Sequence, residues 1–496
     1  MSEHHHEFGC GCDCTRRGFL GGVSLAIGAG ALGPLRAVAQ GAGQEAPHKE
    51  PAVIRAAFIY PPSARFADDP NGWWSWPGNH FDAEGRQRQY MAAFAEMEKN
   101  LGVKIACDET SIGDMSEARQ LAEELKTARP DGLLLVVLYN RANHEWDLLL
   151  KVAEELDIPT IFYVALGAVH QHRLRPKWRR PGMYPIEAVD NFDAIEDGVR
   201  MIHARKRMAQ SLLLSITEAS EPREGTEAFL GTRVRVIPFK RYAERFKAAE
   251  IDEDAKKWID SWVKPAREVR WINQQQALEA ACRAHLALKS LLAEHGADGL
   301  TMNCLRRGML KPCLSFATLN GQGIPAACEN DFPAMYTLLL GSLLTGRGGF
   351  MGNPAFDTER NHYYLSHCTC TPELHGPEGE DAPYLLTRFA HSNEGSCAIQ
   401  TFWPPDEPVT LVRYYPGKPP ALDVYAGRVY KSHEEPPAGG CTTNVEIEIT
   451  DRPDALMVKG HHNVLFAGDF ARRFRLFANL HKMQLADTGY QGVWPG

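Results

Sequence analysis

Side chains that commonly bind metal ions occur at three places in the second half of the chain. The first place holds Glu329 and Asp331, just before an expected helix. The second is His367, at the end of an expected strand, and the third is the adjacent pair His461 and His462. Carboxylate and imidazole groups together suit divalent cations, which act as Lewis acids on bound oxygen atoms. A metal centre is therefore one hypothesis for these residues.

Each of these residues also has a structural interpretation. An acidic residue before a helix often caps it, because the carboxylate accepts hydrogen bonds from the free backbone N–H groups of the first turn. A single histidine at the end of a strand often serves only the packing. Adjacent residues of a strand point to opposite faces, so at most one of His461 and His462 faces a given site. The sequence leaves open which one.

Strand and helix patterns alternate over the first part of the mature chain. Apolar runs predict strands at residues 53–60, 103–107, 131–138 and 159–164. Helical patterns between them cover residues 86–100, 116–128 and 144–156. Short connections between alternating strands and helices are typical of a doubly wound parallel sheet. The continuous apolar run after Asp131 suits a strand that is buried on both faces of such a sheet.

The pattern predicts an α/β protein with three structural domains. Two Rossmann-like parallel-sheet domains are expected at residues 52–180 and 181–355, and the second carries Glu329. After residue 355 the helical periodicity fades, and short apolar runs lie between Pro and Gly residues. Residues 356–496 are therefore expected to form a β-rich, barrel-like domain, with His461 and His462 in it. Catalytic groups of open α/β sheets gather at strand carboxyl ends and domain junctions.

The order of these features resembles the L-fucose isomerase and L-arabinose isomerase superfamily. The matching motifs are Cys-Glu-x-Asp at residues 328–331, Phe-Met-Gly-Asn at 350–353, His-Cys at 367–368 and His-His at 461–462. The resemblance implies a bound Mn²⁺, or another divalent cation, with Glu329, His367 and one of His461 and His462 as ligands. It also implies that Glu329 acts as an acid or base while an aldose and a ketose interconvert through an enediol.

One position departs from the family pattern. Where the resemblance implies a second catalytic carboxylate, this chain has Asn353, which can bind a metal through its amide oxygen but cannot exchange a proton. Asp331 and Asp357 are the candidates to replace that carboxylate. With one carboxylate missing, a second hypothesis is a non-catalytic periplasmic carbohydrate-binding protein on an isomerase fold.

Three tryptophans, Trp73, Trp74 and Trp76, follow the first expected strand. Indole rings stack on the apolar C–H faces of sugars, so these residues are candidates for substrate binding. A hydrophobic lid or an oligomer contact is the alternative interpretation. The family resemblance implies a homo-oligomer, with active sites at subunit contacts.

The N-terminus has the pattern of a twin-arginine signal peptide, at residues 1–39. Thr-Arg-Arg-Gly-Phe-Leu at residues 15–20 precedes an apolar stretch that is shorter than the roughly 20 residues of a transmembrane helix. Ala-Val-Ala at residues 37–39 supplies a cleavage site, and residues 40–51 are an expected linker. We expect the twin-arginine translocase to export the folded chain to the periplasm or beyond, without stable membrane insertion.

Composition limits the function and the role of the cysteines. The net charge of -8 argues against nucleic-acid binding, which requires a basic surface. Three of the twelve cysteines lie in the signal segment, and the nine that remain cannot all pair within one chain. Cys368 and Cys370 form a Cys-x-Cys sequence, but no second pair accompanies it. We therefore expect most cysteines to be buried free thiols, with one or two disulfides permitted by an oxidising compartment.

Overall fold

The computed structural model describes residues 49–67, 81–139, 142–165, 176–305, 307–389, 396–435 and 440–486. Trp73, Trp74 and Trp76, the expected signal peptide and most of the expected linker lie outside the described residues. All elements below belong to one compact unit, residues 44–496. No helix within the described ranges has the length and hydropathy that a membrane-spanning helix needs.

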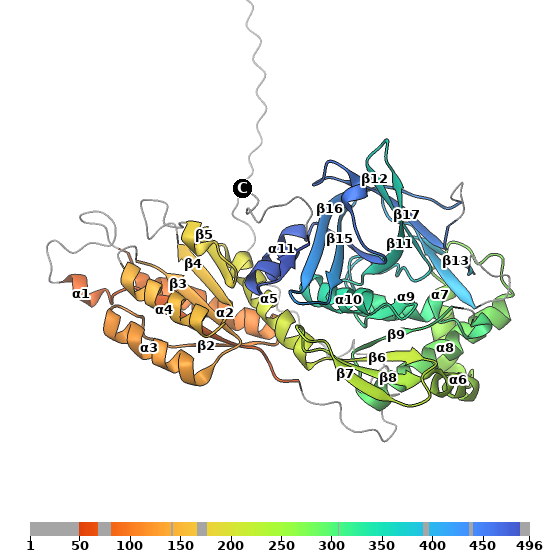
Figure 1. Ribbon diagram of the computed structural model, residues 1–496, viewed down its shortest axis with the longest axis horizontal. Coiled ribbons are helices and arrows are strands. Elements are labelled where there is room, and N and C mark those ends of the chain that lie inside the picture. The colour runs from red at the N-terminus through yellow and green to blue at the C-terminus, as the bar shows by residue number, and fades with distance from the viewer. Residues whose placement is uncertain are drawn as a thin grey trace, which may run out of the picture. The chain divides into compact units, whose positions relative to one another are not determined.

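A five-stranded parallel sheet forms the N-terminal part, in the order β2-β1-β3-β4-β5 (Figure 1). Its strands are β1 (Val53–Ile59), β2 (Lys104–Cys107), β3 (Gly132–Val137), β4 (Thr160–Ala165) and β5 (Met183–Ala188). The helices of this part are α1 (Ala64–Ala67), α2 (Ala83–Leu101), α3 (Met115–Ala128), α4 (Asn143–Glu155) and α5 (Phe192–Gln210). β3 and β4 are buried along their whole length, as their uninterrupted apolar sequences predict for central strands of a covered parallel sheet.

Strand β5 differs from the sequence prediction. We expected the second domain to begin at residue 181, but β5 pairs in parallel with β4 and completes the first sheet. Pro185 and Glu187 interrupt the apolar run of this strand, which weakened its signal in the sequence. The first sheet therefore extends to Ala188, and α5 follows it directly.

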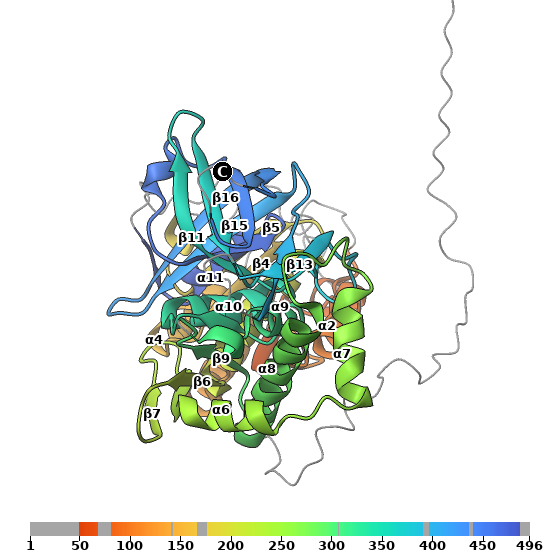
Figure 2. The same ribbon diagram turned by 90° about the vertical axis from the view of Figure 1, so that its right-hand side faces the viewer.

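A second sheet has the order β10-β9-β6-β8-β7. Its strands are β6 (Leu212–Thr217), β7 (Arg223–Thr226), β8 (Arg233–Pro238), β9 (Gly299–Met302) and β10 (Ala326–Cys328), parallel except at β7. Its helices are α6 (Phe239–Ala248), α7 (Glu253–Val263), α8 (Gln274–His295), α9 (Cys313–Gly321) and α10 (Phe332–Thr345). The long helix α8 contacts α6, α7 and α9 (Figure 2). Strand β10 leads directly to Glu329 at its carboxyl end.

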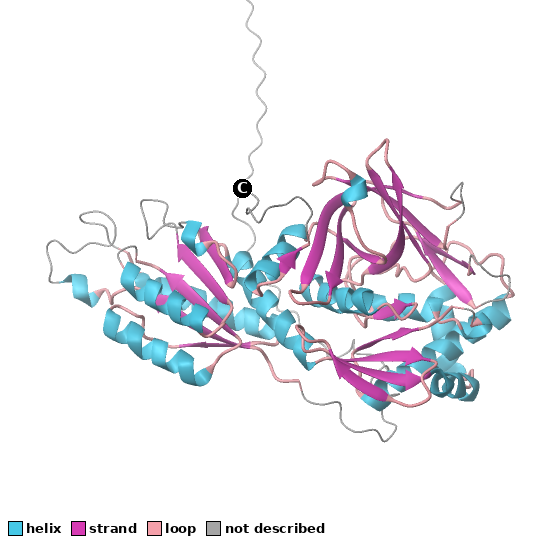
Figure 3. Ribbon diagram, viewed as in Figure 1, coloured by secondary structure: helices cyan, strands magenta, loops and turns pink. Residues whose placement is uncertain are grey.

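Antiparallel strands form a β-barrel in the C-terminal part (Figure 3). Six strands close it, in the order β15-β18-β11-β12-β17-β16 and back to β15. They are β11 (Phe350–Asp357), β12 (His362–His367), β15 (Pro408–Tyr415), β16 (Ala421–Ser432), β17 (Thr443–Ile449) and β18 (Asn463–Ala467). This barrel confirms the predicted β-rich C-terminal part, and its first strand begins at Phe350, before the predicted boundary at residue 356.

The remaining elements join these parts. They are the hairpin of β13 (Tyr384–Arg388) and β14 (Cys397–Thr401), the short strand β19 (Gln484–Leu485), the helix α11 (Ala471–Leu480), and the 3-10 turns Pro176–Trp178, Gly308–Leu310 and Ala455–Met457. Helix α11 contacts β16 of the barrel and also β5 of the first sheet. Helix α10 contacts β15 and β18, so the helix that follows Glu329 is packed against the barrel.

The barrel contains a buried carboxylate whose ionisation should affect stability. Asp423 on β16 is fully buried, and burial raises its pKa from 3.8 to about 6, despite hydrogen bonds with Tyr425 and Tyr415. The folded state then binds a proton more tightly than the unfolded state does. Its stabilising contribution is complete below about pH 4 and is lost as the pH rises through about 6, by on the order of 2–3 kcal/mol.

The variant Asp423→Asn removes this titration, so its free energy of unfolding should fall less between pH 4 and pH 7 than that of the wild type. Urea unfolding at several pH values measures the difference. Asp357→Asn, at a partly exposed position at the end of β11, is the control. Equal pH slopes for the wild type and Asp423→Asn would show that Asp423 titrates normally.

Candidate metal centre

Glu329 projects from a tight turn between β10 and α10. Glu329 and Asn330 have φ values of 60° and 58°, in the left-handed region that few residues other than glycine adopt. The hydroxyl of Ser215 on β6 donates a hydrogen bond to Asn330 Oδ1 at 2.7 Å. The backbone N–H of Asn330 donates to the carbonyl oxygen of Met302 at 3.2 Å. These contacts hold the turn and present the Glu329 carboxylate, whose side chain is 28% exposed.

The barrel brings the two histidines together from separate strands. His367 is the last residue of β12, and His462 immediately precedes β18. Strand β11 lies between them, and it pairs with β12 at Asn353 and with β18 at Gly352. The rings of His367 and His462 lie with their centroids 5.1 Å apart and their planes at 87°. Both residues are buried, with 3% and 2% of their surfaces exposed.

Both imidazole rings turn a nitrogen toward the same carboxylate. Oε1 of Glu329 is 3.7 Å from Nε2 of His367, and Oε2 is 3.6 Å from Nε2 of His462. One ligand atom from each residue lies within 4.8 Å of the other two. Ligands that bind one cation at about 2.0–2.2 Å lie about 3–4 Å from one another, so these separations fit a single small cation. The donor set is two imidazoles and one carboxylate.

Asp331 fixes the orientation of His462. Its Oδ2 accepts hydrogen bonds from Nδ1 of His462 at 3.0 Å and from the backbone N–H of the same residue at 3.1 Å. An ionised carboxylate only accepts, so Nδ1 carries a proton, and in the neutral imidazole the lone pair is on Nε2. Nε2 is buried and has no hydrogen-bond partner among the described residues. A carboxylate behind a histidine in this way is the usual support of a metal-binding imidazole.

Arg413 on β15 stabilises this support. Its Nη1 is 3.5 Å from Oδ2 of Asp331 and donates a hydrogen bond to the carbonyl oxygen of His462. Burial alone would raise the pKa of Asp331. Hydrogen bonds from His462 and from the backbone of Ala334, together with the charge of Arg413, lower it instead to about 2. Asp331 is therefore ionised at all physiological pH values.

The electrostatic environment favours positive charge between these groups. The interaction with His367 lowers the pKa of Glu329, despite burial. Burial would lower the pKa of His367, but its interactions with Cys328 and Glu329 raise that pKa well above the usual value. A proton on His367 or a cation between the ligands would each supply this charge.

The structure distinguishes the two adjacent histidines. His461 is exposed and lies outside the group formed by Glu329, His367 and His462, although its ring centroid is 4.2 Å from that of His462. Both histidines precede β18 instead of lying in it, and their planes differ by 32°. The argument from the opposite faces of a strand therefore does not apply here, although only one of the two histidines, His462, belongs to the group.

The remaining residues that the sequence suggested for the site are Asn353, Asp357 and the three tryptophans. Asn353 lies in β11, between the strands that lead to the two histidines, and is partly exposed. Asp357 lies at the far end of β11, where it pairs with Arg360 near the surface. The three tryptophans lie outside the described residues.

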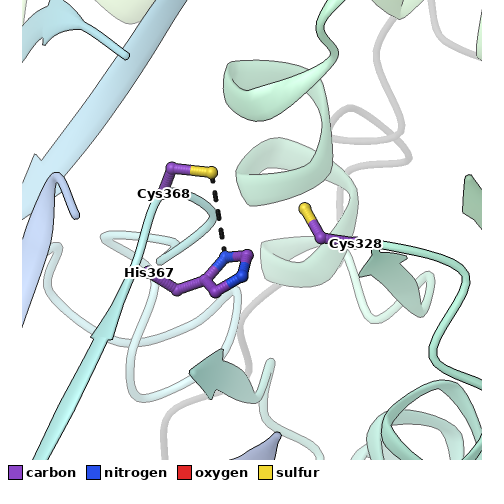
Figure 4. Close-up of side chains that lie close together, drawn as sticks. All are labelled: Cys328, His367 and Cys368. Carbon is purple, nitrogen blue, oxygen red and sulfur yellow. Dashed lines mark hydrogen bonds between the residues drawn. The ribbon is translucent and has the colours of Figure 1, made fainter. Parts of the chain in front are cut away.

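Sequence reasoning missed two features of the site. Arg413 lies in a buried strand, and nothing in its local sequence marks it. The second feature is a thiol group beside His367: Sγ of Cys368 is 3.7 Å from Nδ1 of His367, and Cys328 completes a second group of possible ligands (Figure 4). The sequence offered two signals: each cysteine adjoins an expected ligand, Glu329 or His367, and Cys368 belongs to the Cys-x-Cys sequence that lacks a second pair.

Comparisons with known proteins name no family. No protein-family model matches the chain, and no curated protein matches it. Among solved structures, the chain is matched to the crystal structure of GanP, a glucose-galactose binding protein from Geobacillus stearothermophilus, at 11% sequence identity. The match covers 60% of this chain and 93% of that one, with a TM-score of 0.18. A score this low does not establish a shared fold.

Proposed function

We propose that Glu329, His367 and His462 bind a divalent cation and that the chain is a sugar isomerase-like protein. The observation that carries the metal site is the buried Nε2 of His462, which lacks a hydrogen-bond partner among the described residues and which Asp331 holds toward Glu329. Mn²⁺ suits this carboxylate and imidazole set, as do Co²⁺ and Zn²⁺. In this proposal Asp331 is a positioning residue, because its contacts go to His462, Arg413 and the first turn of α10.

The proposed chemistry is aldose–ketose interconversion through an enediol. A cation in this site would act as a Lewis acid on the neighbouring oxygens of a sugar. Glu329 is the partly exposed carboxylate of the group, and we assign to it the removal of a proton from one sugar carbon and its return to the next. The proton that moves between the two sugar oxygens needs a carrier, and Asn353 cannot be one.

The position of Asn353 favours a second candidate function, which is carbohydrate binding without turnover. It lies in β11, the strand between those leading to His367 and His462, at the position where the family resemblance implies the second catalytic carboxylate. One general acid or base contributes about 10²–10⁴-fold to a rate, so its absence would leave a slow isomerase or none.

The variant Asn353→Asp tests these candidates against each other. We expect the wild type, loaded with Mn²⁺, to exchange sugar hydrogen for deuterium slowly in D₂O, and Asn353→Asp to do so at least about 10-fold faster. NMR of a panel of aldoses and ketoses measures the exchange, and Asn353→Ala is the control that adds no proton carrier. Sugar binding without exchange in the wild type and in Asn353→Asp would exclude the isomerase and support the binding protein.

We also propose the compartment, the substrate class and the oligomeric state of the protein. The twin-arginine pattern supports export of the folded chain to the periplasm or beyond, and the substrate is proposed to be a small sugar. Because folded cargo keeps its bound ions, the cation would be acquired in the cytoplasm before export. A homo-oligomer with sites at subunit contacts is the remaining expectation.

A further inference from the structure

A cluster of buried thiols lies beside His367. Its members come from separate elements: Cys304 follows β9, Cys313 begins α9, Cys328 ends β10, Cys368 follows β12 and Cys441 precedes β17. None of the five forms a disulfide, and none is more than 9% exposed. The folding of both the second sheet and the barrel is needed to bring them together.

The imidazole of His367 has one nitrogen on each side. Its Nε2 is 3.7 Å from Oε1 of Glu329, and its Nδ1 is 3.7 Å from Sγ of Cys368. The thiol of Cys328, at the end of β10, lies near the same ring and interacts with it (Figure 4). The two sulfur atoms and a ring nitrogen of His367 lie within 4.8 Å of one another.

Further thiols surround these three groups. Cys328 interacts with Cys304, and Cys368 interacts with Cys313 and Cys441. Zinc binds thiolate sulfur at about 2.3 Å and imidazole nitrogen at about 2.0–2.1 Å, so its tetrahedral ligands lie about 3.3–3.8 Å apart. The 3.7 Å between Cys368 and His367 is within that range.

Simple core packing explains other cysteines of the chain better than these. A buried thiol packs as a small apolar group with a weak S–H donor. Cys282 donates to the carbonyl oxygen of Ala255 at 3.3 Å, and Cys370 accepts from Nε1 of Trp403 at 3.2 Å. In the cluster, by contrast, Cys328 and Cys368 interact with other thiols and with an imidazole, which is the donor set of a thiophilic cation.

We propose that Cys328, Cys368 and Nδ1 of His367 bind a second cation, of the thiophilic Zn²⁺ class, and that Cys304 or Cys441 is the fourth ligand. Each cysteine releases its proton when its sulfur–metal bond forms. Thiolates select a soft cation, whereas Glu329 and Nε2 of His367 and His462 suit a harder one. The ring of His367 would then release its N–H proton as well and bridge, as an imidazolate, two sites of different selectivity. The inference rests on the proposed function only in that both sites share His367.

Co²⁺ titration of the reduced, signal-cleaved protein tests the thiol site, because thiolate-bound Co²⁺ has a charge-transfer absorption in the near ultraviolet. We expect two Co²⁺ per chain, one of them with this absorption. The double variant Cys328→Ser/Cys368→Ser should lose the absorption and one Co²⁺ but still bind Mn²⁺. Glu329→Gln should keep the absorption. Cys282→Ser, whose hydroxyl can still donate to Ala255, is the matched control and should behave as the wild type.

The Co²⁺ titration of the wild type tests the thiol site even where a variant fails to fold. Absence of the thiolate absorption in the reduced wild type would overturn the proposal. A disulfide between Cys328 and Cys368 in the exported protein, seen as a mass loss without reductant, would overturn it as well. A wild type that shows the thiolate absorption but does not bind Mn²⁺ would count against the proposed function alone. A wild type that binds Mn²⁺ but lacks the thiolate absorption would count against the thiol site alone.

Discussion

Replacing Glu329 by glutamine is expected to weaken Mn²⁺ binding by more than about 100-fold and to abolish sugar turnover. Removing an outer-shell carboxylate typically costs about 10–100-fold in metal affinity, and a direct ligand should matter more. Glutamine keeps the shape but removes the only carboxylate among the three ligands, so the cation would face two neutral imidazoles. Equilibrium dialysis with elemental mass spectrometry measures the affinity, and sugar exchange in D₂O measures turnover.

The barrel supplies a matched control for this substitution. Glu446 on β17 also lies between two histidines, but Nδ1 of His362 is 2.8 Å away and Nε2 of His433 is 2.7 Å away. These are direct hydrogen bonds, which leave no room for a cation between the groups. Glu446→Gln should therefore leave Mn²⁺ affinity unchanged. Unaltered Mn²⁺ affinity in Glu329→Gln would refute the assignment of Glu329 as a ligand.

Asp331→Asn is expected to weaken Mn²⁺ binding by about 10–100-fold while the fold is preserved. Asparagine caps a helix about as well as aspartate, so the hydrogen bond to the backbone of Ala334 should remain. The neutral amide cannot hold Nδ1–H of His462 as firmly, and it adds an N–H donor that allows the wrong ring orientation. Competition with a chelator measures the affinity, and excess Mn²⁺ should restore activity.

Asp252→Asn separates the metal effect from the capping effect. Asp252 caps α7 by accepting a hydrogen bond from the backbone of Ala255 at 2.8 Å, and it is not part of the metal group. Asp331→Asn should have the lower melting temperature, because it also loses the charge beside Arg413, but only Asp331→Asn should need extra Mn²⁺. If excess Mn²⁺ fails to restore Asp331→Asn, the residue does more than position His462.

The local sequence was sufficient to predict most of the N-terminal sheet. β3 and β4 are central strands whose apolar runs are uninterrupted, and the helices between the strands have clear periodicity. β5 was assigned to the wrong domain because Pro185 and Glu187 break its pattern, and because pairing with β4 is a long-range property. The barrel could be predicted only as β-rich, since its closure through β15 and β16 depends on register.

The candidate site was predictable as a set of residue types but not as an arrangement. Glu329 follows the end of β10 and His367 ends β12. In the structure, Oε1 of Glu329 is 3.7 Å from Nε2 of His367. The choice between His461 and His462 depends on the turn before β18, which no periodicity describes. The contact of Asp331 with His462 joins two distant segments, so the sequence suggested only a helix cap or a catalytic acid.

A crystal of the Mn²⁺-loaded protein, measured at wavelengths on both sides of the manganese absorption edge, locates the ion directly. We predict one anomalous peak about 2.0–2.2 Å from a carboxylate oxygen of Glu329 and from Nε2 of both His367 and His462. Nδ1 of His462 should remain hydrogen-bonded to Asp331. Manganese bound elsewhere, with these three side chains left without it, would contradict the metal centre and the function proposed for it.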